Sequence, residues 1–181
     1  MENTQTVTKW AVDPMHSEVE FKVRHLVIST VTGKFKSFDG EIKTTNENDF
    51  DGAEVSFSVN INSIDTNAPD RDAHLKSDDF FAADKHPHMI FKGKFHKTGE
   101  NTYDITGPIT IRETTKEITF EGELGGIMKD GYGNTKSGFE ITGKVNRKEF
   151  GLTWSQVTET GGVVVGDEVK MHLNLQFGKQ Q

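Results

Sequence analysis

The run of residues 67–88, NAPDRDAHLKSDDFFAADKHPH, concentrates the side chains of this chain that could do chemistry. It holds three histidines, His74, His86 and His88, together with five aspartates. Imidazole and carboxylate groups are common zinc ligands, so one hypothesis is a metal-dependent enzyme that uses these three histidines. The run has no HExxH spacing or other familiar ligand arrangement, and the metal hypothesis therefore rests on residue types alone.

A structural interpretation of the same run competes with the chemical one. Leu75, Phe80 and Phe81 could insert into the end of the fold as an apolar plug. Three nearby side chains, those of Arg71, Asp72 and His74, could then satisfy buried polar groups through charge-assisted hydrogen bonds. We prefer this interpretation, in which the run supports the fold and carries no catalysis.

Composition limits the classes of function. A chain of 181 residues is expected to form a single domain over residues 1–181. Its net charge of −7 argues against binding to nucleic acids, which favours a basic surface. The chain has no cysteine, which excludes disulfides and thiolate metal sites. It also has no G-x-S-x-G elbow and no phosphate-binding loop, so no cofactor is expected.

The N-terminal segment, MENTQTVTKW, resembles no secretory signal, because it carries an acid at its second position and has no apolar core. No apolar stretch of the chain is long enough to span a bilayer as a helix. If Met1 is the natural start, we expect a cytoplasmic protein. If a signal peptide has been removed, a periplasmic or secreted one is expected. Residues 1–8 are expected to be flexible.

Alternation of apolar and polar residues runs through most of the chain and predicts strands with one apolar face. Short turn signals separate the segments, as antiparallel neighbours require. Only residues 67–84 break the alternation for long, and there a short helical segment is expected. The predicted strands number eight: 17–25, 31–43, 53–61, 89–97, 102–112, 117–126, 137–145 and 169–177.

One shared interior follows from this pattern, since almost every strand has one apolar face and none is apolar on both. An eight-stranded antiparallel barrel satisfies that requirement and leaves few open edges, whereas a two-sheet sandwich is the alternative. Glycines recur on the inward face among bulky neighbours: Gly33, Gly93, Gly107, Gly122 and Gly143. They either let the strands bend or leave internal space, and such a space would suit an apolar, elongated ligand.

Five motifs in order resemble the YceI-like family. They are WAVDPMHSEVEFKVRHL (10–26), VTGKFKSFDGEI (31–42), SIDTNAPDRDAHLKSDDFFAADKHP (63–87), GPITIRETTKEI (107–118) and RKEFGLTW (147–154). The resemblance implies an all-β, lipocalin-like barrel with an apolar pore for polyisoprenoids or similar amphiphiles, and a homodimer. Glu113, Thr114 and His86 depart from the family's pattern, which leaves the preferred ligand headgroup open.

The sequence therefore favours a non-enzymatic carrier that holds a polyisoprenoid or fatty-acyl chain in the barrel. The residues expected to line its pore are Phe21, Val23, Phe35, Phe57, Val59, Phe91, Ile109, Ile111, Phe120, Phe139, Ile141, Leu152, Trp154, Met171, Leu173 and Leu175. Two alternatives stay open. One is the metal-dependent enzyme at the barrel mouth, and the other is a barrel that fills its own interior and acts only as a dimerising module.

Overall fold

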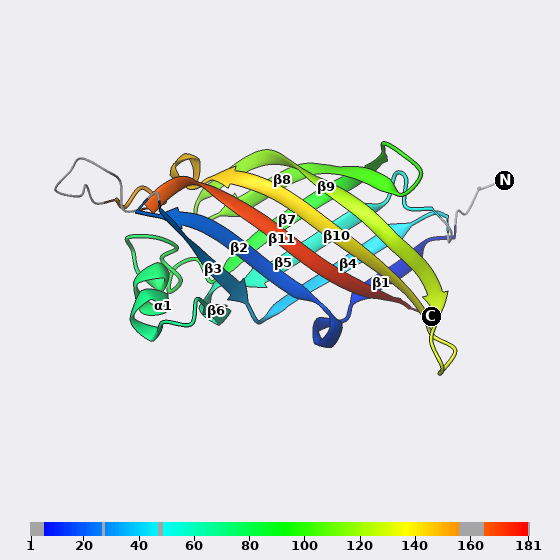
Figure 1. Ribbon diagram of the computed structural model, residues 1–181. Helices are drawn as coiled ribbons and strands as arrows, with labels where there is room; N and C mark the ends of the chain where they lie inside the picture. The colour runs from blue at the N-terminus through cyan, green and yellow to red at the C-terminus, as the bar shows by residue number, and fades with distance from the viewer. Residues whose placement is uncertain (1–5, 27, 47–48, 156–164, 181) are drawn as a thin grey trace.

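The computed structural model describes residues 6–26, 28–46, 49–155 and 165–180, which form one antiparallel β-barrel with a single α-helix in this part of the chain (Figure 1). The strands are β1 (Thr8–Val12), β2 (Glu18–His25), β3 (Ser29–Phe35), β4 (Phe38–Thr44), β5 (Glu54–Asn60), β6 (Ile64–Asp65), β7 (His88–Lys97), β8 (Thr102–Ile111), β9 (Thr114–Lys129), β10 (Thr135–Asn146) and β11 (Val165–Lys179). The helix α1 spans Pro69–Lys76, and short 3-10 turns follow β1, β5 and β10.

The barrel closes because β1 pairs with β11. Three of the barrel strands are each broken into two pieces, β1 with β2, β3 with β4, and β5 with β6. Both β1 and β2 pair with β11. Next to them, β4 pairs with β1 and β3 with β2, and then β5 pairs with β4 and β6 with β3. Each broken pair counts as one barrel strand, and with β7 to β11 this gives eight barrel strands around one interior. The predicted eight-stranded antiparallel barrel is confirmed, and the sandwich alternative is wrong.

The interruptions are where the sequence prediction differs from the structure. Asp13 accepts a hydrogen bond from the amide of Met15 and begins the turn that separates β1 from β2. The predicted strand 31–43 is split at residues 36–37 into β3 and β4. Both β1 and the two-residue β6 were missed, because neither is long enough to show a repeated alternation.

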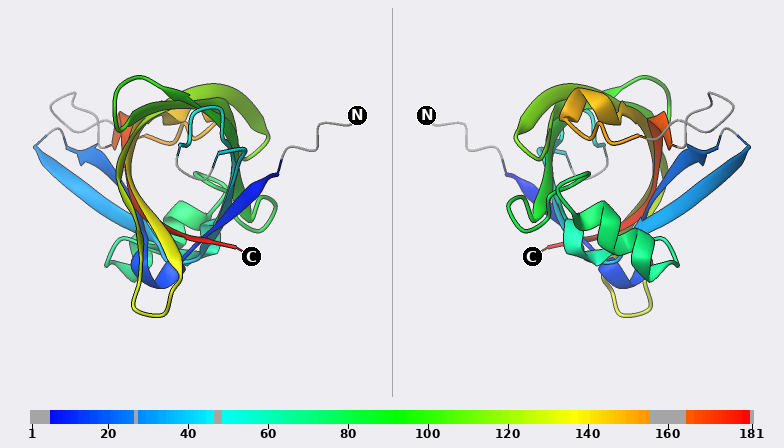
Figure 2. Two further views of the ribbon diagram at one scale, coloured as in Figure 1. Left: turned by 90° about the vertical axis from the view of Figure 1, so that its right-hand side faces the viewer. Right: turned by 90° about the vertical axis from the view of Figure 1, so that its left-hand side faces the viewer.

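At one end of the barrel, β2 and β3 form a ribbon that projects outward, with β2 still paired to β11 on its inner edge (Figure 2). The outer edge of β3 pairs with β6 only at Lys34 and Phe35. In the described part of the chain no strand joins the rest of that edge to β7. The segment that contains α1 covers this end of the barrel, as the right-hand view of Figure 2 shows. The helix lies within the predicted helical segment 67–84 and is shorter than it.

The opposite end of the barrel is sealed by aromatic side chains. Phe139 packs edge-on against Phe50, Phe95 and Phe177, and Trp10 packs against Phe50. All five are almost completely buried. Edge-to-face contacts of this kind add stability beyond the burial of area alone. This cluster, which we call the aromatic end, closes the interior opposite α1.

Tyr103 joins the aromatic end and turns its hydroxyl outward. The hydroxyl donates a hydrogen bond to Asp49 (3.0 Å), while the ring contacts Phe95. Burial, followed by the hydrogen bond to the Asp49 carboxylate, raises the pKa of Tyr103 to about 12. The Tyr103 phenol is therefore neutral at neutral pH and stays so at a higher pH than an exposed tyrosine would.

The N-terminal expectation needs a correction. Residues 1–5 lie outside the described part of the chain, but Thr8 already belongs to β1, is buried and pairs with Thr44. The first strand therefore begins at Thr8, inside the segment 1–8 that was expected to be flexible. No helix among the described residues is both long and apolar enough to cross a membrane.

The sealed end can be tested by titration. The chain has two tyrosines, so Tyr103 is the only one left in a Tyr132→Phe variant. Because the folded pKa is raised from 10 to about 12, the stability that depends on the neutral phenol is present below pH 10 and is lost as the pH rises toward 12. We expect the tyrosinate absorbance of this variant to have its midpoint near pH 12. A midpoint near pH 10 would contradict a sealed aromatic end.

Candidate functional site

The interior between the aromatic end and α1 contains two adjoining apolar cavities, of about 60 and 90 Å³. The first lies in the middle of the barrel, next to the aromatic end. The second lies under α1 and the ribbon of β2 and β3. Val19, Met89 and Met171 line both cavities and so form the boundary between them.

Most of the residues predicted to line a pore do face these cavities. The middle cavity is lined by Phe57, Val59, Phe91, Ile109, Phe120, Ile141, Leu173 and Leu175, and Met171 stands at its boundary. The cavity under α1 is lined by Phe21, Val23, Phe35, Ile111 and Leu152, again with Met171. The alternation of the strands therefore identified inward-facing positions from both halves of the barrel.

Two of the predicted residues lie elsewhere. Phe139 belongs to the aromatic end, and Trp154 packs its ring against His74 (4.7 Å between centroids) and Phe80 (5.4 Å) at the α1 end. Neither lines either cavity. Phe139 is buried in the interior, as expected, but the alternation gives no information about how far along the barrel axis a residue lies. Trp154 lies in no strand, in the segment after β10 and its 3-10 turn, so the alternation does not place its side chain.

Other lining residues were missed although their pattern was visible. Val19 has the same parity as Phe21 in its strand, and Met89 stands two positions before Phe91. Val55 likewise shares the inward parity of its strand and lines the middle cavity. Ile42 also lines it, but it has the opposite parity to Val31 and Phe35 in the predicted strand 31–43, and it faces inward only because the strand is broken at residues 36–37. The plug residues Leu75, Phe80 and Phe81 also line the cavity under α1.

Phenylalanine rings cover most of the inward glycines, which are Gly33, Gly40, Gly93 and Gly143, whereas Gly107 faces the Lys92 backbone and Gly122 faces Ile105. Phe21 lies over its cross-strand partner Gly33, and Phe57 lies over its partner Gly40. A β-carbon placed on either glycine would overlap the ring. These glycines therefore do not leave empty space, as one of the two interpretations of the sequence supposed. They let large rings lie flat against the barrel wall, an arrangement known from other sheets.

The cavities are small because the rings and two methionines fill most of the interior. Sites for drug-sized ligands usually occupy about 300–1,000 Å³, so a chain ligand must move side chains to enter. Met89 and Met171 are suited to this role, since methionine is unbranched and adapts its shape to irregular spaces. The two methionines are two of the three side chains that separate the cavities.

The plug at the α1 end has the expected apolar side chains and the expected roles of Arg71 and Asp72, whereas His74 contacts the exposed Asp79 and no buried polar group. Phe80 is buried, and Phe81 makes an edge contact with Phe35 across the cavity mouth. Asp72 accepts hydrogen bonds from the amide (2.8 Å) and hydroxyl (2.5 Å) of Thr66, and Arg71 donates to the same hydroxyl and to the Thr66 carbonyl. These contacts fix the start of α1 to the strand β6 before it.

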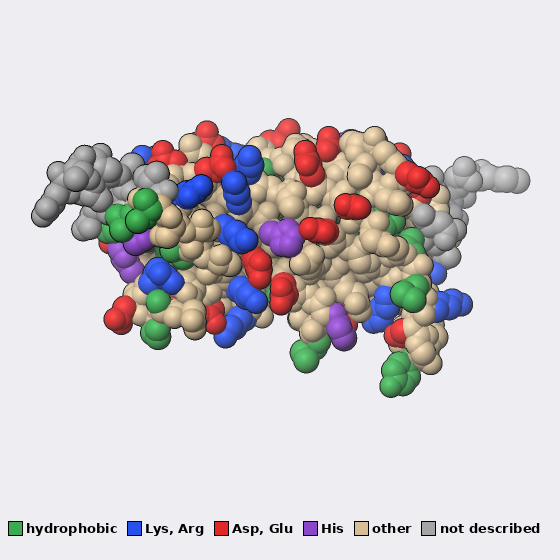
Figure 3. All heavy atoms as spheres, in the orientation of Figure 1, with side chains coloured by type: hydrophobic (Ala, Val, Ile, Leu, Met, Phe, Trp, Pro, Cys, Tyr) green, Lys and Arg blue, Asp and Glu red, His purple; other side chains and the backbone are tan. Residues whose placement is uncertain are grey.

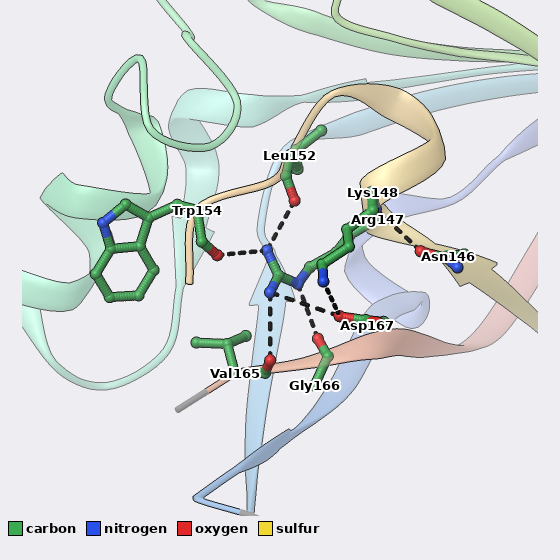
Figure 4. A network of polar contacts seen from close by, with 8 residues as sticks. All are labelled: Asn146, Arg147, Lys148, Leu152, Trp154, Val165, Gly166 and Asp167. Carbon is green, nitrogen blue, oxygen red and sulfur yellow. Dashed lines mark hydrogen bonds and ion pairs between the residues drawn. The ribbon is translucent and has the colours of Figure 1, made fainter. Parts of the chain in front are cut away.

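Arg147 is the main polar anchor of this end (Figure 4). Its buried guanidinium donates to the carbonyls of Leu152 and Trp154, both at 2.7 Å, and to Gly166 at 2.8 Å. Burial lowers the pKa of Arg147, and the nearby Asp167 carboxylate opposes that shift. The side chain thus ties the segment after β10 to the start of β11 by satisfying carbonyls that would otherwise be buried without donors.

The three histidines of the metal hypothesis do not share a ligand site. His74 contacts Asp79 (2.9 Å), His86 faces Glu113 at 3.6 Å, and His88 is exposed at the start of β7. The described residues contain no group of three or more histidine, cysteine, aspartate or glutamate side chains that could hold a metal ion. The geometry therefore gives no support to the metal-dependent enzyme.

Comparisons with known proteins agree with the fold. A family model described as the YceI-like domain matches residues 10–177. A UPF0312 protein of Staphylococcus epidermidis is 37% identical over 172 residues, which cover 94% of this chain and 98% of the relative. The crystal structure of a Campylobacter jejuni YCEI protein is 32% identical and superposes with a TM-score of 0.73 over 87% of this chain and 90% of that one.

A more distant structure shares the architecture. A polyisoprenoid binding domain from Saccharophagus degradans is 14% identical to this chain and superposes with a TM-score of 0.68. The match covers 93% of this chain and 97% of that domain. At this level of identity the likeness establishes the fold alone.

The pairing of rings with glycines predicts the effect of a single methyl group. Gly40→Ala should push the Phe57 ring off the wall and into the middle cavity, which we expect to lower the free energy of unfolding by about 1–3 kcal/mol. Gly131→Ala is the control, since no atom lies within 4 Å of its β-carbon position. Urea denaturation measures both, and equal stability of the two variants would contradict the packing described here.

The anchoring role of Arg147 predicts a large loss on a conservative change. Arg147→Lys keeps the charge but cannot reach all of the carbonyls, and we expect a loss of about 3–5 kcal/mol in the free energy of unfolding. The neighbouring Lys148→Met removes only a surface ion pair with Asp167 and should cost less than about 1 kcal/mol. Similar losses in the two variants would show that Arg147 is not an anchor.

Proposed function

The chain belongs to the YceI-like family, and from this premise we propose that it is a non-enzymatic carrier that holds one long apolar chain inside its barrel. The preferred cargo is a polyisoprenoid or a fatty-acyl amphiphile. The observation that carries the proposal is the row of two apolar cavities along the barrel axis, separated only by Val19, Met89 and Met171.

The shape of the interior favours a chain over a compact ligand. The cavities follow one another between the barrel walls, and the aromatic end stops them on one side. Apart from Glu20 and Arg147 at the outer cavity, every residue that lines either space is apolar. A charged or strongly polar molecule would lose its hydration there without gaining partners, whereas a hydrocarbon would not.

Burial of apolar area would supply the binding free energy. Each methylene removed from water contributes about 0.8 kcal/mol, so a buried stretch of about ten methylenes contributes roughly 8 kcal/mol before the cost of ordering the chain. A gain of that size corresponds to a dissociation constant near 1 μM. The rearrangement of the methionines and rings opposes binding and makes the affinity depend on how easily the interior opens.

We assign the entrance to the α1 end. The aromatic end is closed by fully buried rings, whereas the α1 end is covered by a short helix with no buried residue of its own and by the plug of Leu75, Phe80 and Phe81. A polar headgroup of the cargo would remain at this end, near His74 and Arg71. The Saccharophagus domain of the same fold, named as polyisoprenoid binding, is consistent with a chain-like cargo.

The family resemblance also implies a homodimer, and we retain it as part of the proposal. Light scattering of the purified protein in solution tests it directly, because a monomer and a dimer differ twofold in mass.

A lumen substitution tests the carrier proposal. Phe57→Asp puts a carboxylate into the middle cavity and should weaken the binding of a fluorescent long-chain fatty acid at least tenfold, because the charge must be desolvated. Ser58→Asp, on the outward face of the same strand, is the matched control and should leave the affinity unchanged. The affinities are measured by fluorescence titration after circular dichroism has shown that each variant is folded.

A milder variant covers the case in which Phe57→Asp does not fold. Leu173→Asn replaces a lining side chain of the middle cavity by a polar one of similar length. We expect it to weaken binding of the same probe several-fold. Wild-type affinity in both folded lumen variants would show that the chain does not enter the barrel.

A further inference from the structure

The tip of the ribbon formed by β2 and β3 exposes large apolar side chains. Leu26 is 40% exposed and Ile28 is 84% exposed, and they lie between the end of β2 and the start of β3. Leu26 has a φ angle of +53°, in the left-handed region that a branched apolar residue rarely occupies. The tip thus combines an exposed apolar surface with an unfavourable backbone angle, and packing against the barrel explains neither.

This tip lies beside the proposed entrance of the barrel. Phe21 and Val23 of β2 line the cavity under α1, and Leu26 follows Val23 by only three residues, which is about 10 Å along a strand. The tip and α1 occupy the same end of the molecule in Figure 1. In Figure 3 apolar side chains are visible at that end. The apolar tip is therefore next to the opening through which a chain would pass.

A row of three lysines crosses the outer wall behind the tip. Lys144 pairs with Lys170 across β10 and β11, and Lys170 pairs with Lys22 across β11 and β2. Like charges at paired positions on neighbouring strands are destabilising. Among the described residues only Lys144 of the three forms an ion pair, with Glu168 at 4.0 Å. We call these three residues the lysine row, and Figure 3 shows basic side chains gathered over this part of the wall.

We propose that this end of the barrel docks on a lipid bilayer, with Leu26 and Ile28 inserted at the boundary between headgroups and acyl chains. The lysine row would then face anionic headgroups, since Lys22 stands about 13 Å from Leu26 along β2 and its long side chain can extend toward the surface. The inference rests on the proposed carrier function, because docking there would let a chain move between bilayer and barrel without crossing water.

The charge of the whole chain sets the character of this binding. A net charge of −7 opposes long-range attraction to an anionic membrane. Insertion of the two apolar residues therefore provides most of the affinity, and the lysine row contributes locally, at about 1 kcal/mol for each lysine near an anionic surface. Binding to neutral vesicles should be detectable, and anionic lipid should strengthen it.

Vesicle flotation of the full chain tests the inference. The probes are vesicles of phosphatidylcholine alone and of phosphatidylcholine mixed with phosphatidylglycerol. The double variant Leu26→Ser/Ile28→Ser should lower the bound fraction about tenfold or more on both. The matched control is Met128→Ser/Tyr132→Ser, which removes two exposed apolar side chains at the β9–β10 turn, at the other end of the barrel, and should bind as the wild type does.

A second pair of variants tests the lysine row. Lys22→Gln/Lys170→Gln should lower binding about fivefold or more on the anionic vesicles and leave binding to phosphatidylcholine unchanged. Lys92→Gln/Lys94→Gln, which makes the same change of charge on β7, should have a smaller effect.

Should the tip variant Leu26→Ser/Ile28→Ser alter folding, the single change Ile28→Ser gives the same test at the more exposed position.

Two results would overturn the docking inference. One is a wild-type protein that floats with neither vesicle, and the other is a tip variant that binds as well as the wild type or no worse than its control. Binding of the fluorescent fatty acid without vesicles is measured in parallel on all variants. A wild-type protein that does not bind the fatty acid counts against the carrier function. The flotation result alone decides whether the tip docks on a bilayer.

Discussion

The whole structure depends on the need of every strand to bury one apolar face in the same interior. No strand can satisfy this alone, and an open sheet would leave edges exposed, so the chain closes on itself through the pairing of β1 with β11. At the breaks after β1, β3 and β5 the inward-facing residues change between even and odd positions, so that both pieces of each broken strand still bury one face. The same closure produces the long apolar interior on which the proposed function relies.

The interior combines two demands that oppose each other. Stability favours a filled core, and the paired rings and glycines, such as Phe57 on Gly40, fill it to the point where only small cavities remain. A carrier also needs a core that can open. Met89 and Met171, the unbranched side chains at the boundary between the cavities, can change shape at low cost. The α1 end is covered by a helix without buried residues, whereas the aromatic end is closed by buried rings, so we expect opening at the α1 end.

Much of this fold could be predicted from the sequence, because parity along a strand follows directly from residue order. Parity places Phe21 and Leu173 inside correctly, but it carries no information on height along the axis, and so Phe139 was expected in the pore and lies in the aromatic end. The splitting of 31–43 and the short β1 depend on contacts with distant strands. The anchoring role of Arg147 was not foreseen either, since a charged residue is normally expected at the surface and only the assembled fold surrounds it with carbonyls.

The central claim is that the barrel holds one long apolar chain, and native mass spectrometry of the freshly purified protein tests it most directly. Gentle ionisation should show a mass added to each subunit, and organic extraction should release an isoprenoid or acyl compound at about one per subunit. A protein that carries no such compound, and that also fails to take up a long-chain isoprenoid or fatty acid when one is supplied, would contradict the account.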